Sequence, residues 1–266
     1  MNKMDNKNSL SGKKIVLTRN KEQSGELRSK LENLKAAVIE LPLIKILPFN
    51  DEDETDDVFL ELGSYEWIIF TSRNGVQNFF NLFFNKFKDI RCIGGLKIAC
   101  IGPGTAAEVA KYHLEVDFIP REAESENLAD ELIESQSMDN TKVLVITGNL
   151  NRDVLVETLE EKGHAIVDTL QVYETQLEDL SHNKEAKIFR EMGADVIIFL
   201  SSSAVTSFIL QVKSLKLEPS AKHPLICSIG PLTSKTIRDA GLTVNVEAKN
   251  HTIDGIVDIL LEKLAK

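Results

Sequence analysis

The fold is decided by a stretch of sequence that occurs twice. Residues 68–80 read IIFTSRNGVQNFF, and residues 197–209 read IIFLSSSAVTSFI. Three further pairs recur in the same order: KIVLT from Lys14 with KVLVI from Lys142, IACIGPGT from Ile98 with ICSIGPLT from Ile226, and NLADELI from Asn127 with GIVDILL from Gly255. The members of every pair lie 128 or 129 residues apart. Four ordered pairs at one offset indicate a tandem duplication of a unit of about 128 residues.

Within each repeat, short runs rich in Val and Ile alternate with helical stretches such as the one carrying Leu27, Leu31 and Leu34 at i, i+4 and i+7. This alternation is typical of a parallel sheet covered by helices on both faces. Strands are predicted near residues 14–18, 37–41, 67–71, 97–101 and 116–119, and near 142–147, 165–169, 195–200, 225–229 and 243–246. The pattern predicts an α/β protein with two flavodoxin-like lobes.

After the second strand of each repeat the chain stays extended and apolar, as LPLIKI from Leu41 and LQVYET from Leu170. These stretches are interpreted as a two-stranded connector between the lobes. If both cross, each lobe contains parts of both repeats. The first lobe then comprises residues 1–41 and 174–266, with residues 1–12 as a loose tail, and the second comprises residues 42–173.

Composition narrows the class of protein. Of the 266 residues 42% are hydrophobic and 27% charged, which is ordinary for a soluble globular chain. No apolar run reaches the roughly 18 residues that span a bilayer, and the polar start is unlike a signal peptide, so a cytoplasmic protein is expected. Cys92, Cys100 and Cys227 show no CxxC spacing and are interpreted as reduced. The net charge of −10 argues against nucleic-acid or membrane binding, and a monomer is the default expectation.

Polar clusters follow the predicted strands, at the edge where ligands of open parallel sheets bind and helix N-termini point outward. The residues predicted to bind an anionic substrate there are Arg19, Thr71, Ser72, Arg73, Gly102, Thr105, Ser201, Ser202, Gly230 and Thr233. The competing interpretation is that these hydroxyls only cap helices, each stabilising by about 1 kcal/mol. Related Gly-Pro turns at Gly102 and Gly230 favour a carboxylate or phosphate receptor.

Other site chemistries find little support in the sequence. The segment GPGTAA from Gly102 approaches the dinucleotide fingerprint GxGxxA, but it follows the fourth strand rather than the first. The five histidines show no paired metal spacing, and GxSxG and Walker motifs are absent from the sequence. Tyr173 is a catalytic candidate because its phenol falls on a predicted connector, and the alternative interpretation is that its ring packs under a strand.

The successive motifs KKIVLTR, IELPLIKI, IIFTSRNGV, IACIGPGT, VYET, IIFLSSSAV and CSIGPLT resemble those of uroporphyrinogen-III synthases over residues 13–262. Asn20 departs from the proline that many relatives have. The resemblance implies a lyase of heme biosynthesis that closes linear hydroxymethylbilane into uroporphyrinogen III, inverting the terminal pyrrole ring and losing water through a spiro intermediate. It also implies two α/β lobes with the substrate in the cleft between them, and no cofactor or metal.

In this resemblance Tyr173 matches the tyrosine of the VYET-like motif, which is suspected of assisting the leaving hydroxyl. A phenol is protonated at neutral pH and can donate a hydrogen bond or a proton. Two alternatives stay open: a non-catalytic two-lobed protein that closes on a small anion, and a flavodoxin-like nucleotide binder. Either would explain the repeat but would give no tetrapyrrole product.

Overall fold

A computed structural model describes residues 9–18, 21–150 and 153–265. The chain divides into two compact units. Unit 1 comprises Met1–Lys45 and Gln176–Lys266, and unit 2 comprises Ile46–Thr175. The predicted boundaries, after residues 41 and 173, lie four and two residues before the observed ones.

Unit 1 contains a five-stranded sheet in the order β10-β9-β8-β1-β2. Its strands are β1 (Lys14–Leu17), β2 (Ala37–Glu40), β8 (Val196–Phe199), β9 (Leu225–Ser228) and β10 (Val246–Glu247). All neighbouring strands run parallel. Their carboxyl ends therefore meet at one edge, where the segments after β1, β8 and β9 begin.

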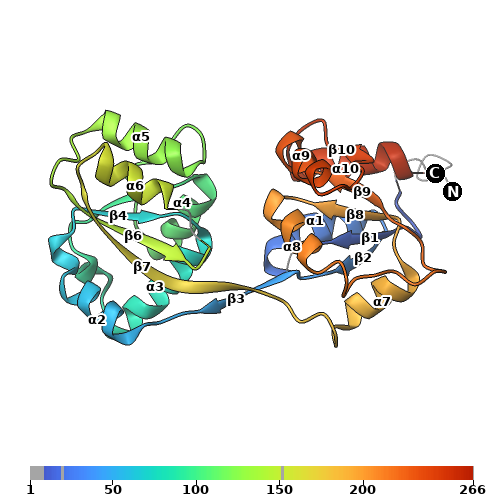
Figure 1. The fold of residues 1–266 in the computed structure, drawn as a ribbon, viewed down its shortest axis with the longest axis horizontal. Helices are drawn as coiled ribbons and strands as arrows, with labels where there is room; N and C mark the ends of the chain where they lie inside the picture. Colours follow the sequence, from blue (N-terminus) through green and yellow to red (C-terminus); the bar gives the residue numbers. More distant parts are fainter. Residues whose placement is uncertain (1–8, 19–20, 151–152, 266) are drawn as a thin grey trace. The chain divides into compact units, whose positions relative to one another are not determined.

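Helices cover both faces of this sheet (Figure 1). They are α1 (Lys21–Asn33), α7 (Lys184–Met192), α8 (Ser202–Leu210), α9 (Pro231–Asp239) and α10 (Ile253–Leu264). Side chains of β1 alternate between the faces: Ile15 and Leu17 pack with α1 and α10, and Val16 packs with α7, α8 and α9. Two separate cores result, as expected of a strand buried on both faces.

Unit 2 contains the sheet β3-β7-β6-β4-β5. Its strands are β3 (Ile44–Pro48), β4 (Trp67–Phe70), β5 (Lys97–Cys100), β6 (Lys142–Gly148) and β7 (Ile166–Leu177). The four strands from β7 to β5 are mutually parallel. Beyond β5, a single bridge joins Ala99 to Phe118.

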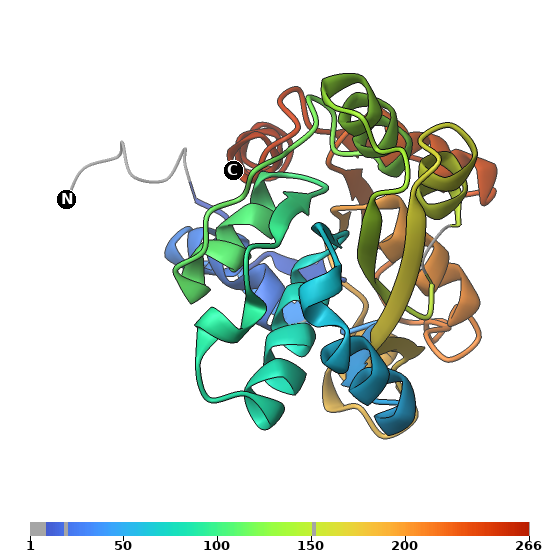
Figure 2. The same cartoon turned by 90° about the vertical axis from the view of Figure 1, so that its left-hand side faces the viewer.

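Five α-helices and three short 3-10 helices belong to the described part of unit 2. They are α2 (Glu52–Leu60), η1 (Leu62–Ser64), α3 (Arg73–Lys86), η2 (Ile90–Ile93), α4 (Pro103–Val109), η3 (Ala110–Tyr112), α5 (Ser125–Ser135) and α6 (Val154–Glu161). Helices α5 and α6 cover one face, and α2, α3 and α4 the other. Figure 2 shows unit 2 from the side with helices on both faces of its sheet.

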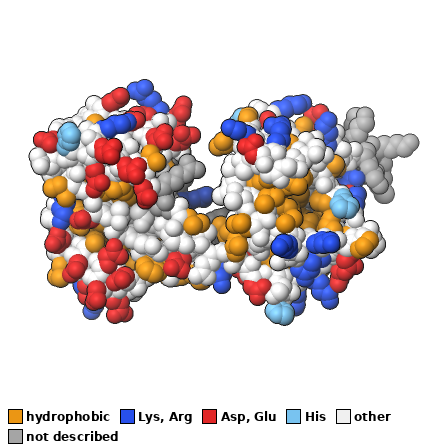
Figure 3. All heavy atoms as spheres, in the orientation of Figure 1, with side chains coloured by type: hydrophobic (Ala, Val, Ile, Leu, Met, Phe, Trp, Pro, Cys, Tyr) orange, Lys and Arg blue, Asp and Glu red, His pale blue; other side chains and the backbone are white. Residues whose placement is uncertain are grey.

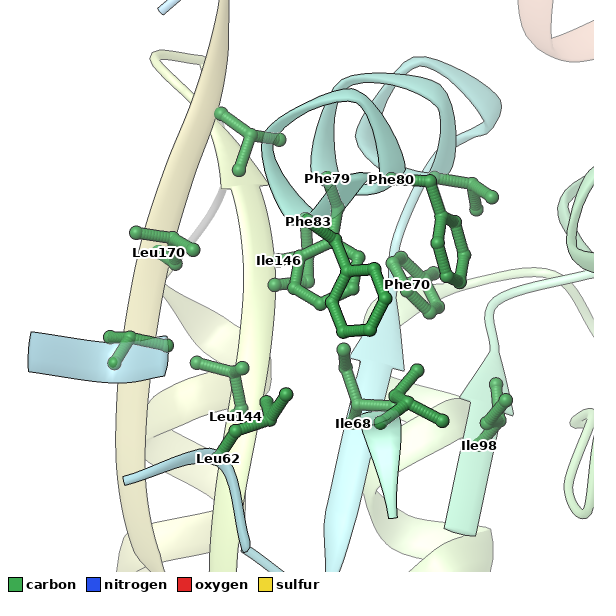
Figure 4. Close-up of a cluster of buried hydrophobic side chains, with 14 of the residues drawn as sticks. Leu62, Ile68, Phe70, Phe79, Phe80, Phe83, Ile98, Leu144, Ile146 and Leu170 are labelled. Carbon is green, nitrogen blue, oxygen red and sulfur yellow. The ribbon is translucent and has the colours of Figure 1, made fainter. Parts of the chain in front are cut away.

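An aromatic core lies under α3 (Figure 4). Phe79 and Phe83 project from α3 toward the strands that carry Phe70 and Ile146. The centroid of the Phe79 ring lies 5.5 Å from that of Phe70 and 5.8 Å from that of Phe59, and both pairs are edge-to-face. Such edge-to-face pairs add about 0.5–1.5 kcal/mol each to the burial of the rings. This core fixes the helix whose first turn carries predicted site residues.

The two repeats exchange halves. The unit 1 sheet combines β1 and β2 of the first repeat with β8, β9 and β10 of the second, whereas unit 2 combines β6 and β7 with β4, β5 and the Phe118 bridge. With the first two strands of one repeat numbered 1 and 2 and the last three of the other 3 to 5, both sheets have the flavodoxin order 2-1-3-4-5. The predicted fold class is thus confirmed.

The connector is two-stranded, as predicted. Phe49 N–H donates to the Val172 carbonyl at 3.0 Å, and Glu178 N–H donates to the Leu43 carbonyl at 3.1 Å. The residue numbers rise on one strand as they fall on the other, so β3 and β7 are antiparallel. The strand predicted at 165–169 was too short, because β7 continues without interruption to Leu177.

The predicted fifth strands were too long. Residues 116–119 form only the Phe118 bridge, and the strand predicted at 243–246 is the two-residue β10. In both repeats a side chain takes the place of the main-chain partner. Asp117 Oδ2 accepts the Ile98 N–H at 2.7 Å, and Asn245 Oδ1 accepts the Ile226 N–H at 2.8 Å. Because these side chains accept the main-chain N–H groups, regular strand pairing begins later at the edge of each sheet.

Candidate functional site

In each unit the predicted site residues lie at the carboxyl edge of the sheet. In unit 2, Ser72 and Gly102 follow β4 and β5, and in unit 1, Ser201 and Gly230 follow β8 and β9. Each of these four residues is the N-cap of the helix that follows. The four helix starts are therefore repeat-related in pairs.

Tyr173 and Ser72 meet at the edge of unit 2. Ser72 Oγ donates to the Tyr173 phenol oxygen at 3.1 Å and accepts the Gly75 N–H at 2.9 Å. The Tyr173 side chain is half-buried and packs against the aromatic core. With its oxygen already accepting a bond, the phenol retains its own hydrogen as a donor. The hydrogen bond from Gly75 N–H to Ser72 Oγ polarises the Ser72 hydroxyl and makes it a better donor to the phenol oxygen.

The neighbouring predicted residues of unit 2 have different surroundings. Thr71 Oγ1 donates to the Ile146 carbonyl at 3.2 Å, so its hydroxyl joins β4 to β6. Arg73 is exposed, and a Cβ built on Gly104 would lie 3.9 Å from its Nε. This guanidinium is thus beside the first turn of α4, where Thr105 is buried.

Glu108, also on α4, is close enough to Arg73 for the two charges to interact. Burial raises the pKa of Glu108, but hydrogen bonds from Lys111 and Gln77 and the charge of Arg73 lower it overall. The carboxylate is therefore charged and accepts from Lys111 Nζ at 2.7 Å. Its charge offsets part of the positive field that Arg73 offers an anion.

In unit 1, Ser201 acts as a capping residue. Its Oγ accepts the Ala204 N–H at 3.3 Å and lies 3.0 Å from Ser203 Oγ. Ser202, the next residue, has a buried hydroxyl that bonds to no atom of the described chain. A buried donor without a partner costs about 1–3 kcal/mol, so a ligand atom at this position would relieve it.

The Gly-Pro turn of unit 1 adjoins a histidine that the sequence did not single out. A Cβ on Gly230 would lie 2.9 Å from Cδ2 of His251, an exposed residue after β10. The equivalent Gly102 faces the Ala123 Cβ at 3.0 Å. Thr233, like Thr105, is buried in the first turn of its helix. The repeat offset of 128 pairs Ala123 with His251, and this pairing could have revealed the histidine.

The helix starts at the Gly-Pro turns are poorer anion receptors than expected. Pro103 and Pro231 have no N–H, and the Thr105 N–H donates to the Gly102 carbonyl at 3.1 Å. Fewer donors remain in these first turns than at an ordinary helix start. Arg19 lies outside the described residues, so its predicted role stays a prediction.

Two residues beside Tyr173 are not among the predicted site residues. Gly148 ends β6 and Asn149 follows it; both border the phenol-bearing segment of β7. Both residues lie at the end of the first strand of the second repeat, but their contact across to β7 has no sequence signal. Within the described residues there is no cluster of three His, Cys, Asp or Glu that could hold a metal ion.

The fold and its two edges define a duplicated α/β protein with exchanged halves. A family model described as uroporphyrinogen-III synthase HemD matches residues 25–258. A uroporphyrinogen-III synthase of Synechococcus elongatus is 30% identical over 97% of both chains, and a putative one of Methanocaldococcus jannaschii is 30% identical over 93% of this chain and 97% of its own. The chain belongs to the uroporphyrinogen-III synthase family.

Further relatives agree. A porphyrin biosynthesis protein HemD of Ruminiclostridium josui is 32% identical over 96% of this chain, which spans about half (49%) of that protein. Solved uroporphyrinogen III synthases of Thermus thermophilus (a mutant) and Helicobacter pylori share the fold, both with TM-scores of 0.62. Their identities are 13% and 16%, over 93% and 94% of this chain and 96% and 99% of theirs.

The family membership confirms the predicted enzyme class, a lyase of heme biosynthesis, and does not favour the non-catalytic anion or nucleotide binder. No helix among the described residues is long and apolar enough to cross a membrane. The substrate cleft predicted between the lobes depends on how the two units are placed relative to each other, so it stays a prediction.

Proposed function

We propose that the chain converts hydroxymethylbilane into uroporphyrinogen III and that Tyr173 assists loss of the hydroxyl. The observation that carries this assignment is the bond from Ser72 Oγ to the Tyr173 oxygen at 3.1 Å. In this bond the phenol oxygen is the acceptor, so the phenol hydrogen is left to donate. Tyr173 lies on strand β7, and its oxygen accepts a bond from Ser72, the N-cap of α3. Both elements are regular, which supports the fixed position that a general acid requires.

The proposed reaction balances without a cofactor. The C–O bond of the hydroxymethyl group breaks, the hydroxyl leaves as water with a proton from Tyr173, and a methylene-pyrrole cation remains. The substituted carbon of the terminal ring attacks this cation and gives the spiro intermediate, which fragments and recloses with the ring inverted. The terminal pyrrole then loses a proton as it becomes aromatic, and the phenolate takes a proton back.

Pyrrole supplies the nucleophile and the electron push, so the protein chiefly holds the folded substrate. We propose that its eight carboxylates are bound by the carboxyl-edge residues of both sheets. In unit 2 these residues are Thr71, Ser72, Arg73, Gly102 and Thr105. In unit 1 they are Ser201, Ser202, Gly230, Thr233 and Arg19, the last of which lies outside the described residues. The partnerless Ser202 hydroxyl and the exposed Arg73 guanidinium support these assignments.

We also propose that the enzyme acts as a cytoplasmic monomer. Each unit has its own buried cores, and the three cysteines are free thiols. Light scattering coupled to gel filtration would test the oligomeric state. A dimer of constant mass across protein concentrations would contradict it.

The test of the reaction is an isomer analysis. The protein is incubated with freshly generated hydroxymethylbilane, and the cyclised products are separated. Spontaneous closure gives the type I isomer, whereas the proposed activity gives type III. A product that stays type I at all enzyme concentrations would overturn the proposal.

A further inference from the structure

Gly148 lies directly under the ring of Tyr173. A Cβ built on Gly148 would lie 2.4 Å from Cζ, 2.5 Å from Cε2 and 2.9 Å from Cε1 of that ring. Carbon atoms in van der Waals contact are about 3.5–4.0 Å apart, so any side chain here would displace the ring. A glycine inside a strand often marks such a close approach.

The strand that carries Tyr173 is irregular at this point. Thr147 pairs with Gln171, but Gly148 pairs with Tyr173, which leaves Val172 as an extra residue on β7. Val172 and Tyr173 both pack against the same core, although consecutive side chains of a regular strand point to opposite faces. The bulge therefore re-aims the phenol, as bulges near active sites do.

Asn149 holds β7 after the bulge. Its Oδ1 accepts the Thr175 N–H at 2.8 Å, and its Nδ2 donates to the Thr175 carbonyl at 3.2 Å. Its main-chain N–H donates to the Tyr173 carbonyl at 3.3 Å. Asn149 thus replaces a strand neighbour: its side chain holds Thr175 and its main-chain N–H holds Tyr173, on the two sides of Glu174.

We propose that Gly148 and Asn149 are positioning residues for Tyr173: Gly148 admits the ring, and Asn149 fixes the strand that carries it. Neither residue donates a proton to substrate in this scheme. The consequence for turnover rests on the proposed function of Tyr173, whereas the coupling between Gly148 and the ring does not.

The first experiment measures turnover of Gly148→Ala by type III formation. A phenol displaced by about 1 Å is expected to lower kcat by about 10²-fold, with KM changed less than threefold. The matched control is Gly63→Ala in the same unit, because a Cβ there has no atom within 4 Å. It should keep full turnover. Gly148→Ala with unchanged kcat would overturn the proposal.

The second experiment places Gly148→Ala in a Tyr173→Ala background and follows urea unfolding, which requires no activity. In the natural background the substitution should lower the urea midpoint. In the Tyr173→Ala background the clashing ring is gone, so the midpoint should not fall further. An equal fall in both backgrounds would contradict the proposal. If this coupling holds while Tyr173→Phe keeps full turnover, the catalytic role of Tyr173 fails and the steric pairing stands.

The Asn149 series covers the case in which Gly148→Ala does not fold. Asn149→Asp keeps the acceptor for the Thr175 N–H, and Asn149→Ala loses it. We expect Asn149→Ala to lower kcat at least tenfold with little change in KM, and Asn149→Asp to recover most of the loss. Equal turnover in both variants would show that the side chain does not position the phenol.

Discussion

The two units share one strand order but differ sharply in charge. By sequence, unit 1 has 21 Lys and Arg against 16 Asp and Glu, a net charge of +5, and unit 2 has 10 against 25, a net charge of −15. Figure 3 shows the acidic side chains gathered on unit 2 and more of the basic ones on unit 1. The whole-chain charge of −10 therefore conceals a unit of the sign that suits a polycarboxylate.

The carboxyl edges of the two sheets also differ, because one of them carries a tyrosine and the other does not. At the repeat position of Tyr173, offset by 129, the other repeat has Ile44. Ser72 and Ser201 are equivalent caps, yet Ser72 alone of the two contacts a phenol in the described structure. Duplication thus supplied two scaffolds, and we propose that unit 2 donates the proton whereas unit 1, with its positive net charge, binds the substrate carboxylates more strongly.

Replacing the phenol should have the largest effect. Tyr173→Phe keeps the ring over Gly148 but removes the donor, so kcat for type III formation should fall by about 10²–10⁴-fold. Tyr112→Phe is the control, since the Tyr112 ring stacks on Phe80 with centroids 4.0 Å apart and lies in the same core. Full turnover in Tyr173→Phe would remove the difference between the two edges.

The aromatic core offers a test of whether the units are independent. Phe79 is fully buried, so Phe79→Ala should destabilise unit 2 by about 3–5 kcal/mol. Cys100 lies in the same core and Cys227 in a core of unit 1. Native-state thiol labelling should accelerate at Cys100 and stay unchanged at Cys227.

The matched variant is Phe199→Ala in unit 1, where Phe199 is also fully buried. It should accelerate labelling of Cys227 and leave Cys100 protected. If either variant exposes both thiols at the same rate, the chain unfolds as one cooperative body. The comparison of two separately stable units would then be wrong.

Because of the same two thiols, we expect the free energy of unfolding to fall at alkaline pH. Burial raises the pKa of both Cys100 and Cys227 to about 12, whereas an unfolded thiol ionises near 8.5. Between these values the unfolded state binds fewer protons, so the free energy of unfolding falls as pH rises. The slope is at most about 1.4 kcal/mol per pH unit for each thiol.

Urea unfolding between pH 8 and pH 10.5 measures this slope. Cys100→Ala and Cys227→Ala should each make it shallower by a similar amount, because burial raises the pKa of both thiols to the same value of about 12. A slope that neither variant changes would assign the alkaline loss to other groups.

The equivalent caps separate stability from catalysis. Ser72→Ala and Ser201→Ala should each cost about 1 kcal/mol in the free energy of unfolding. Ser72→Ala also removes the donor to Tyr173 and should lower kcat about threefold to tenfold. Ser201→Ala should change KM instead. Equal kcat values would show that the Ser72–Tyr173 bond does not matter for turnover.

The sequence predicted the fold well because the repeat fixes it. The repeat placed the start of each predicted strand within a few residues of the observed one, and the unbroken apolar stretches at Leu41 and Leu170 indicated the exchange. The fifth strands were misjudged because Asp117 and Asn245 replace main-chain partners with side-chain atoms. Such substitutions leave the apolar pattern intact and cannot be read from it.

The site was less predictable. Strand ends located the edge, but the sequence could not show that Thr71 bonds to Ile146, nor that Gly148 faces Tyr173. Both contacts join residues 25 to 75 positions apart and depend on register. A one-residue bulge on β7 decides the second contact, and composition carries no sign of it.

The smallest expected effect compares the equivalent threonines Thr105 and Thr233. If their turns bind substrate carboxylates equally in the ground and transition states, valine at either position raises KM about two- to threefold and leaves kcat nearly unchanged. Unit 1 carries the favourable charge, so Thr233→Val should raise KM more than Thr105→Val, and the difference should shrink as salt screens the field. Since both side chains are buried, urea midpoints are measured alongside. A kcat that falls more than KM rises would place these residues in the transition state, and a larger KM effect at Thr105 would reverse the assignment of carboxylate binding to unit 1.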